Sequence, residues 1–241
     1  MSCIFISCVP QETLHTSCTS DQSALALPRM ITFSLFKIPI RILPWFWITL
    51  ALIGGVIYID TKEDFFRLLL FMIAGFISIL VHELGHGLTA KRFGKRVEIV
   101  LQAFGGYAAY TGGAPLSRPK TFLVTAAGPA IQIALGFAVL AAANQFNEIS
   151  PNAMYFLEVL YWISFAWAIL NLLPVLPMDG GRLLETLLGP QRIRITLTIS
   201  IVVAITVAVL GLIFTTMLLL PVFMGMMAYE SYKALKEVRW L

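Results

Sequence analysis

The sequence predicts an all-α polytopic membrane protein with six transmembrane helices and a short membrane-associated β segment between the second and third helices. The chain is 59% hydrophobic, only 12% of its residues are charged, and its mean hydropathy is +0.85. A soluble domain has about twice that share of charged residues. The apolar residues form long runs, and the basic residues cluster between them. These observations exclude an ordinary soluble globule and a disordered chain.

The first 29 residues differ from the apolar body. They are rich in Ser, Thr and Cys and hold all three cysteines, Cys3, Cys8 and Cys18. They lack the charged start and apolar centre of a signal peptide. We expect residues 1–29 to be an N-terminal tail or a mis-called start, with the functional protein beginning at Met30. Because no cysteine lies in the apolar body, neither a disulfide framework nor a thiolate metal site is expected.

Five apolar runs follow the first 29 residues, and their lengths indicate how many times the chain crosses a bilayer. A crossing helix needs about 20 apolar residues. The last run would be about 50 Å long as one helix, at 1.5 Å per residue, which is too long for one crossing. We therefore expect it to form two helices that turn near Gly211–Thr216, giving six spans. The runs are Leu43–Ile59, Leu68–Ala90, Thr121–Ala143, Ala153–Leu173 and Ile195–Tyr229.

The basic residues support this topology. Loops that stay in the cytoplasm are enriched in Lys and Arg. With six crossings, 15 of the 17 basic residues lie on the cytoplasmic side, and both termini are cytoplasmic. A single last helix would instead place Lys233, Lys236 and Arg239 outside. The net charge of +4 then reflects membrane orientation, and no nucleic acid partner is expected.

Two of the three histidines occur in one pentapeptide, His82-Glu-Leu-Gly-His86, inside the second run. Residues 71–89 are predicted to be helical, and positions i and i+4 of a helix lie on one face. Two imidazoles so placed bind one zinc ion, and Glu83 beside the first can take a proton from water. The alternative is a polar patch between helices that matches His-Glu-x-x-His by chance. Ionisable side chains inside a membrane are costly, which favours the site with one zinc per chain.

A third zinc ligand is expected to be acidic. Asp179 follows the fourth run, which ends on the same side of the membrane as the histidine pair, and it lies in a loop stiffened by Pro174 and Pro177. Its alternative role is to cap a short helix. Asn171 either bridges helices, or holds a substrate carbonyl or stabilises the oxyanion. Gln132 is expected to pack between helices or to bridge them. The acidic residues expected on the inner side are Glu98, Asp179, Glu185, Glu230 and Glu237.

At these residues the sequence resembles the site-2 protease family of intramembrane zinc metalloproteases. The resemblance rests on the His82–His86 pentapeptide and on Asn171-Leu-Leu-Pro-x-x-Pro-Met-Asp179-Gly-Gly, with Met178 where Leu is usual. Gly128-Pro129 and Phe104-Gly-Gly-Tyr107 also resemble family features. The resemblance implies that His82, His86 and Asp179 bind zinc, that Glu83 is the general base, and that Asn171 orients the substrate. It also implies a catalytic core of about residues 68–185.

The resemblance further implies regulated proteolysis of transmembrane proteins by a multi-pass protein of the bacterial cell membrane. Residues 30–241 would form a compact, six-helix membrane metalloprotease domain. The loop at residues 92–120 is too short for a PDZ domain, and only about ten residues follow the last run, which leaves no room for a CBS domain. The alternatives from other classes are a metal or ion transporter and a non-catalytic scaffold. A transporter predicts polar residues in the outer half of several spans, and a scaffold predicts the loss of Glu83 or of a ligand.

Residues 97–110 are predicted to form a strand and turn. Val97, Ile99 and Leu101 occupy alternate positions, and Gly105-Gly106 follows them. An exposed strand edge can bind an unwound substrate in extended form, so Gly105 and Gly106 are candidate substrate-binding residues. An ordinary loop beside the membrane explains the same residues, and the family resemblance favours the strand.

Overall fold

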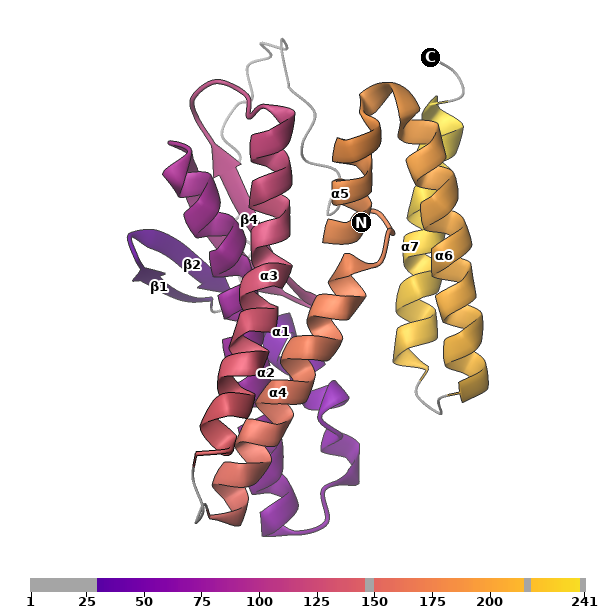
Figure 1. Ribbon diagram of the computed structural model, residues 1–241. Coiled ribbons are helices and arrows are strands. Elements are labelled where there is room, and N and C mark those ends of the chain that lie inside the picture. The colour runs from indigo at the N-terminus through magenta and orange to yellow at the C-terminus, as the bar shows by residue number, and fades with distance from the viewer. Residues whose placement is uncertain (1–29, 146–149, 215–217, 239–241) are drawn as a thin grey trace, which may run out of the picture.

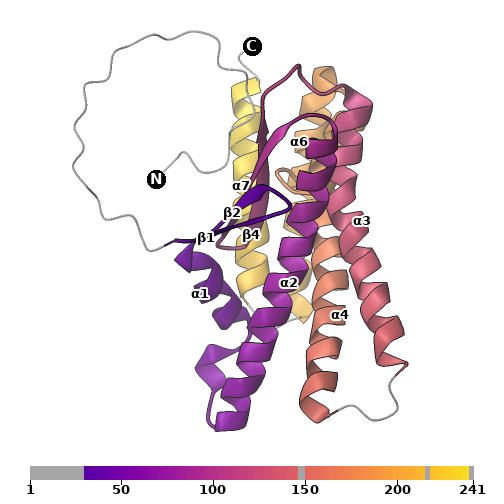
Figure 2. The same ribbon diagram turned by 90° about the vertical axis from the view of Figure 1, so that its left-hand side faces the viewer.

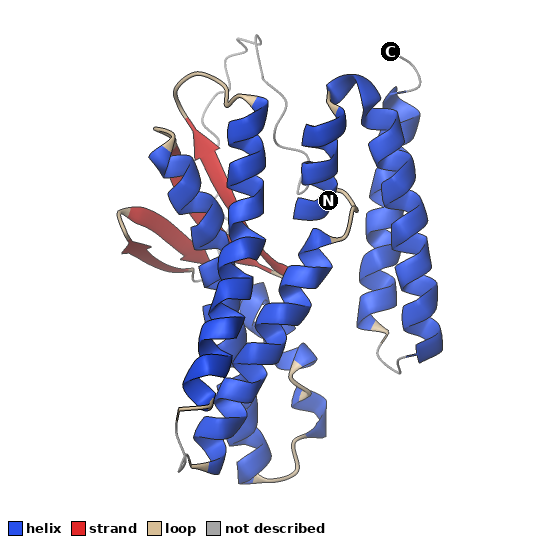
Figure 3. Ribbon diagram, viewed as in Figure 1, coloured by secondary structure: helices blue, strands red, loops and turns tan. Residues whose placement is uncertain are grey.

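The computed structural model describes residues 30–145, 150–214 and 218–238, and it is mostly helical (Figures 1 and 3). The expected tail, residues 1–29, lies outside the described residues. Four helices in the described part are long and apolar enough to cross a membrane. They are α2 (Lys62–Arg92), α3 (Arg118–Ala143), α4 (Pro151–Leu172) and α6 (Ile193–Phe214). These match four of the predicted runs, and the six-span topology stays a prediction.

The first predicted span does not form one crossing helix. Its residues form α1 (Pro44–Ile53) and a 3-10 turn, η1 (Val56–Tyr58). A helix of ten residues is about 15 Å long, half of the thickness of the hydrocarbon core. The helix ends at Ile53 and is capped by Gly54. Gly55 then adopts a left-handed conformation with φ of 84° that a continuing helix cannot accommodate.

The last run forms two helices, as expected. α6 ends at Phe214, and α7 (Leu219–Glu237) returns beside it (Figure 1). Between this pair and the α2–α4 helices lies α5 (Asp179–Leu188), which the 3-10 turn η2 (Pro190–Arg192) connects to α6. Buried residues of the pair, such as Ala204 and Met224, pack against the loop that precedes α5.

A four-stranded sheet lies beside α2 (Figure 2). β3 (Arg96–Gln102) and β4 (Gly105–Thr111) occupy the segment predicted as strand and turn. β1 (Ile31–Leu35) and β2 (Ile38–Ile42) extend the sheet in the order β1-β2-β3-β4. The β1–β2 and β3–β4 pairs are antiparallel, and β2 pairs with β3 in parallel.

The expectation of an all-α fold with a single β segment is therefore corrected. Residues 31–42 follow the expected start at Met30 and were not expected to form strands, but Ile38, Ile40 and Ile42 are buried and alternate with exposed residues. Such a period of two is typical of a strand with one buried face. These isoleucines form one core with Ile99 and Leu101 of β3, Phe46 of α1 and Ile79 and Leu84 of α2. The sheet is thus anchored on the helix that carries the histidine pair.

Candidate metal centre

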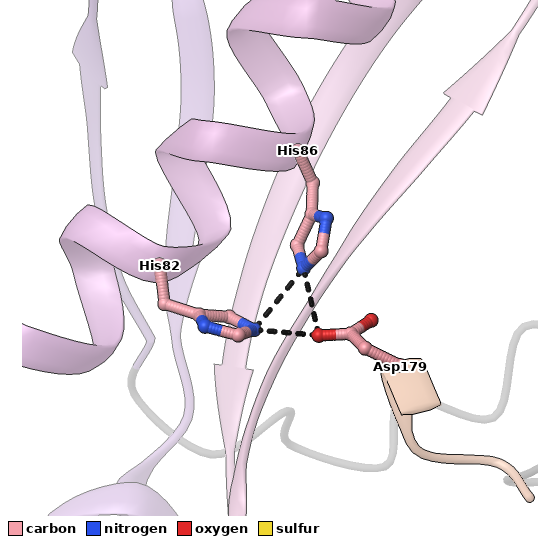
Figure 4. A group of neighbouring side chains, drawn as sticks. All are labelled: His82, His86 and Asp179. Carbon is pink, nitrogen blue, oxygen red and sulfur yellow. Dashed lines mark hydrogen bonds and ion pairs between the residues drawn. The ribbon is translucent and has the colours of Figure 1, made fainter. Parts of the chain in front are cut away.

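α2 presents His82 and His86 on one face, four residues apart, as its periodicity predicts (Figure 4). Both side chains are buried, and so is Glu83 between them. A capping box at the start of the helix, in which Thr61 and Asp64 bond to each other's backbone N–H, satisfies its first free donors. The histidines lie about six to seven turns further along, at 3.6 residues per turn, where α3 and the sheet cover the helix.

Asp179 is the first residue of α5 and points toward the two imidazoles (Figure 4). The chain leaves α4 at Leu172 and folds back tightly before α5 begins. A Cβ atom at position 180 would lie 2.1 Å from the Leu172 carbonyl oxygen, so this turn requires glycine. The fold-back brings a carboxylate from a distant part of the sequence to the face of α2.

Three potential ligand atoms converge at this point. Asp179 Oδ2 lies 3.0 Å from His82 Nε2 and 3.2 Å from His86 Nε2, and the two Nε2 atoms are 3.1 Å apart. Among the described residues, these three side chains form the one His, Cys, Asp or Glu group close enough to hold a metal ion. Two nitrogens and one carboxylate oxygen, with room for a fourth ligand, are the donor set of many catalytic zinc sites.

The hydrogen bonds at the far side of each ring show that the donor set fits a cation. His82 Nδ1 lies 2.9 Å from Gln132 Oε1, and His86 Nδ1 lies 2.8 Å from the Val124 carbonyl oxygen. Both partners accept only, so each ring donates its Nδ1–H and a neutral ring carries a lone pair on Nε2. Asp179 Oδ2 is buried and receives no hydrogen bond, so three lone pairs face one another. A bound metal ion satisfies all three.

Glu83 lies between the histidine pair and β4. A Cβ atom at position 106 would stand 2.9 Å from Glu83 Cγ and 3.1 Å from its Oε1. Gly106 therefore lets the backbone of β4 approach the Glu83 carboxylate closely. Both residues line a cavity beside the three ligand atoms. Its other lining residues are His82, His86, Tyr107, Ala108, Tyr110, Val124, Thr125, Asn171, Pro177, Met178, Asp179 and Arg182.

The two candidate glycines have different surroundings, and the side chain of Asn171 has a defined hydrogen-bond partner. Gly106 lines the cavity, whereas Gly105 faces Trp167, whose Cζ2 would lie 3.0 Å from an added Cβ. Asn171 also lines the cavity, and its Nδ2 donates a hydrogen bond to the Trp167 carbonyl oxygen at 3.0 Å. This local bond fixes the direction of the amide near the ligand atoms.

Two residues at the centre were not expected to act there. Gln132 does bridge helices, as predicted, but its oxygen also holds His82. Gly128 lies against His86, so the Gly128-Pro129 pair marks a close approach of α3 to α2. A single amide in an otherwise apolar span was the one sequence signal for Gln132, whereas no local pattern indicates what Gly128 touches.

Apolar helices that carry two imidazoles and a carboxylate within ligand distance define a membrane-embedded metalloprotein. The family model for Peptidase family M50 matches residues 147–214, and a second model, described as a putative zincin peptidase, matches residues 75–177. A zinc metalloprotease of Methanocaldococcus jannaschii is 31% identical over 160 residues, which cover 66% of this chain and 45% of the relative. The stage IV sporulation protein FB of Bacillus subtilis is 33% identical over 155 residues, which cover 63% of this chain and 48% of that relative.

The fold agrees with these matches. The solved structure of the site-2 protease from Methanocaldococcus jannaschii superposes with a TM-score of 0.63 at 26% identity, covering 86% of this chain and 95% of that chain. The family models, the relatives and the solved structure agree with one another, and they confirm the resemblance to the site-2 protease family of zinc metalloproteases that is seen in the motifs of the chain. The chain spans about half the length of the curated relatives it matches.

Proposed function

We propose that this protein is an intramembrane zinc metalloprotease that hydrolyses peptide bonds in or near the transmembrane segments of other membrane proteins. The observation that carries the proposal is the convergence of His82 Nε2, His86 Nε2 and Asp179 Oδ2 within 3.2 Å, with Glu83 beside them. The similarity to the site-2 protease family supports the same reaction. The membrane metalloprotease domain comprises residues 30–241, with its catalytic core at about residues 68–185.

The positions of the side chains support the roles that we propose for them. His82, His86 and Asp179 hold one zinc ion. Zinc bound in such a site lowers the pKa of water toward 7 and polarises the scissile carbonyl. Glu83 takes a proton from the water that attacks the carbonyl carbon, and then gives it to the amine nitrogen as the C–N bond breaks. Asn171, at the wall of the cavity, orients the substrate carbonyl.

β4 is the part of the sheet that can bind the substrate. A transmembrane helix hides its peptide bonds in internal hydrogen bonds, so it must unwind before cleavage. β4 is the last strand in the sheet order, and in the described part of the chain its outer edge pairs with no strand. Gly106, Tyr107 and Ala108 on this strand line the cavity. An unwound substrate segment added along this edge would pass directly beside Glu83.

The depth of the centre is set by α2. His86 lies five residues before Lys91, about 7.5 Å along the helix axis, and Lys91 and Arg92 end the helix. Because basic residues mark the cytoplasmic side, the centre lies in the inner half of the bilayer, both termini face the cytoplasm, and water reaches the site from there. From the resemblance to the site-2 protease family, we further propose that the substrates are membrane proteins of the bacterial cell membrane and that their cleavage is regulated.

The test compares cleavage by two matched variants. The full chain is co-expressed with candidate single-span membrane proteins, as the wild type, as Glu83→Gln and as Glu158→Gln, the same change at an exposed site of α4. We expect wild type and Glu158→Gln to cut a common substrate and Glu83→Gln to lose at least about 100-fold in rate. Cleavage that persists in Glu83→Gln would contradict the proposed base. A protein that binds zinc and transports it, but cuts nothing, would indicate the transporter alternative.

A further inference from the structure

A buried chain of hydrogen bonds runs from His82 across three helices. His82 Nδ1 lies 2.9 Å from Gln132 Oε1 of α3, and Gln132 Nε2 lies 2.9 Å from Ser78 Oγ of α2. Ser78 Oγ is 3.0 Å from Ser164 Oγ of α4, which lies 2.7 Å from the Leu160 carbonyl oxygen. Gln132, Ser78 and Ser164 are completely buried, so solvent water cannot replace any of these partners.

The direction of each bond in this chain is determined by its far end. The Leu160 carbonyl only accepts, so Ser164 donates its hydroxyl proton there and accepts from Ser78. Ser78 has then used its proton, so its oxygen accepts from the Gln132 amide NH2. The amide is thereby oriented with Oε1 toward His82, and the ring must donate through Nδ1–H. The lone pair of His82 is left on Nε2, which faces Asp179 and His86.

We propose that Gln132 is a positioning residue of the metal centre, which holds His82 in the tautomer and ring orientation that zinc requires. The proposal rests on the zinc site described under the proposed function. The other histidine makes the comparison informative, because His86 Nδ1 donates to a backbone carbonyl that no side-chain change removes. Only His82 depends on a side chain for its orientation. Partners of this kind commonly contribute 10- to 100-fold in metal affinity.

The test measures zinc affinity of the purified full chain by competition with a chelator, alongside the melting temperature. Gln132→Met keeps the size of the side chain but removes the acceptor. We expect it to weaken zinc binding by about 10- to 100-fold and to alter the visible absorption of bound Co2+. Gln132→Glu retains an acceptor oxygen for Nδ1–H, so its affinity should return to within a few-fold of wild type. Val139→Ala, a buried change elsewhere on α3, should lower the melting temperature and leave zinc affinity unchanged.

The outcomes separate this proposal from the proposed function. If Gln132→Met binds zinc as tightly as wild type, or if Gln132→Glu loses as much affinity as Gln132→Met, the positioning role is overturned. If the wild type binds no zinc, both proposals fall together. If wild type binds one zinc with the expected variant pattern and yet cuts no peptide, the positioning role stands and the protease assignment fails.

Discussion

Gly128 of α3 lies directly against the imidazole of His86: a Cβ atom at position 128 would stand 2.2 Å from His86 Nε2. No side chain fits there while the ring keeps its place beside Asp179. The metal centre therefore depends on the distance between two neighbouring helices as much as on its ligands.

Gly128→Ala is expected to displace the His86 ring and to reduce zinc affinity by at least about tenfold. The bound zinc per chain, measured by elemental analysis after dialysis at limiting free zinc, checks this. Gly136→Ala is the matched control on the same helix, because its Cβ would meet Phe165 at 2.4 Å, away from the ligands. That control should lose stability and keep its zinc. Normal zinc content in Gly128→Ala would contradict the assigned ligand role of His86.

Asp179→Asn is expected to remove the link between zinc and stability. A ligand that binds only the folded state stabilises it, by about 2.7 kcal/mol at a free concentration 100 times the dissociation constant. A chelator should therefore lower the melting temperature of the wild type in detergent but hardly change that of Asp179→Asn. Asp60→Asn, at an exposed acidic residue before α2, should respond to the chelator as the wild type does. Equal chelator effects in wild type and Asp179→Asn would exclude Asp179 as a ligand.

Gly106→Val separates catalysis from metal binding. An added side chain would push against Glu83 Cγ and Leu101 Cδ2, at 2.9 Å and 2.7 Å from the Cβ position. Because no ligand atom is among these contacts, zinc content should stay near one per chain while peptide cleavage falls by about 100-fold or more. Gly225→Ala, where nothing lies within 4 Å, should retain both properties. Loss of zinc in Gly106→Val would show that β4 supports the ligands rather than the base.

Arg118→Met tests the contact that holds α5 in place. The Arg118 guanidinium donates hydrogen bonds of 2.6 to 3.0 Å to the carbonyl oxygens of Thr186 and Leu187 in the last turn of α5. A cation at the carboxyl end of a helix also favours its dipole. Since the site is exposed, we expect a loss of only about 1 kcal/mol in the free energy of unfolding. Thermal unfolding of Arg118→Met measures this loss, with Arg194→Met, a change at an exposed arginine of α6, as the control. Equal melting temperatures for the two variants would contradict the stabilising role of Arg118.

Much of the protein could be predicted from local patterns. Long apolar runs indicated α2, α3, α4 and α6, and the excess length of the last run indicated the break before α7. The prediction that the first run forms one crossing helix was wrong, because it gave more weight to the apolar composition of the run than to the two glycines at positions 54 and 55, where the helix stops. The strands at residues 31–42 were missed although Ile38, Ile40 and Ile42 show a period of two, because so short an alternating segment directly before an apolar run is easily taken as part of that run.

The sequence by itself determined that His82 and His86 share a helix face with Glu83 beside them, because a helix repeats every 3.6 residues and the pattern is local. Only the tertiary structure decided the rest. Asp179 reaches the pair through the fold-back after α4, Gln132 reaches His82 through the packing of α3 on α2, and β2 joins β3 after the chain has passed through α1 and α2. Such contacts link residues 50 or more positions apart, and they depend on how whole elements pack rather than on any periodicity within one of them.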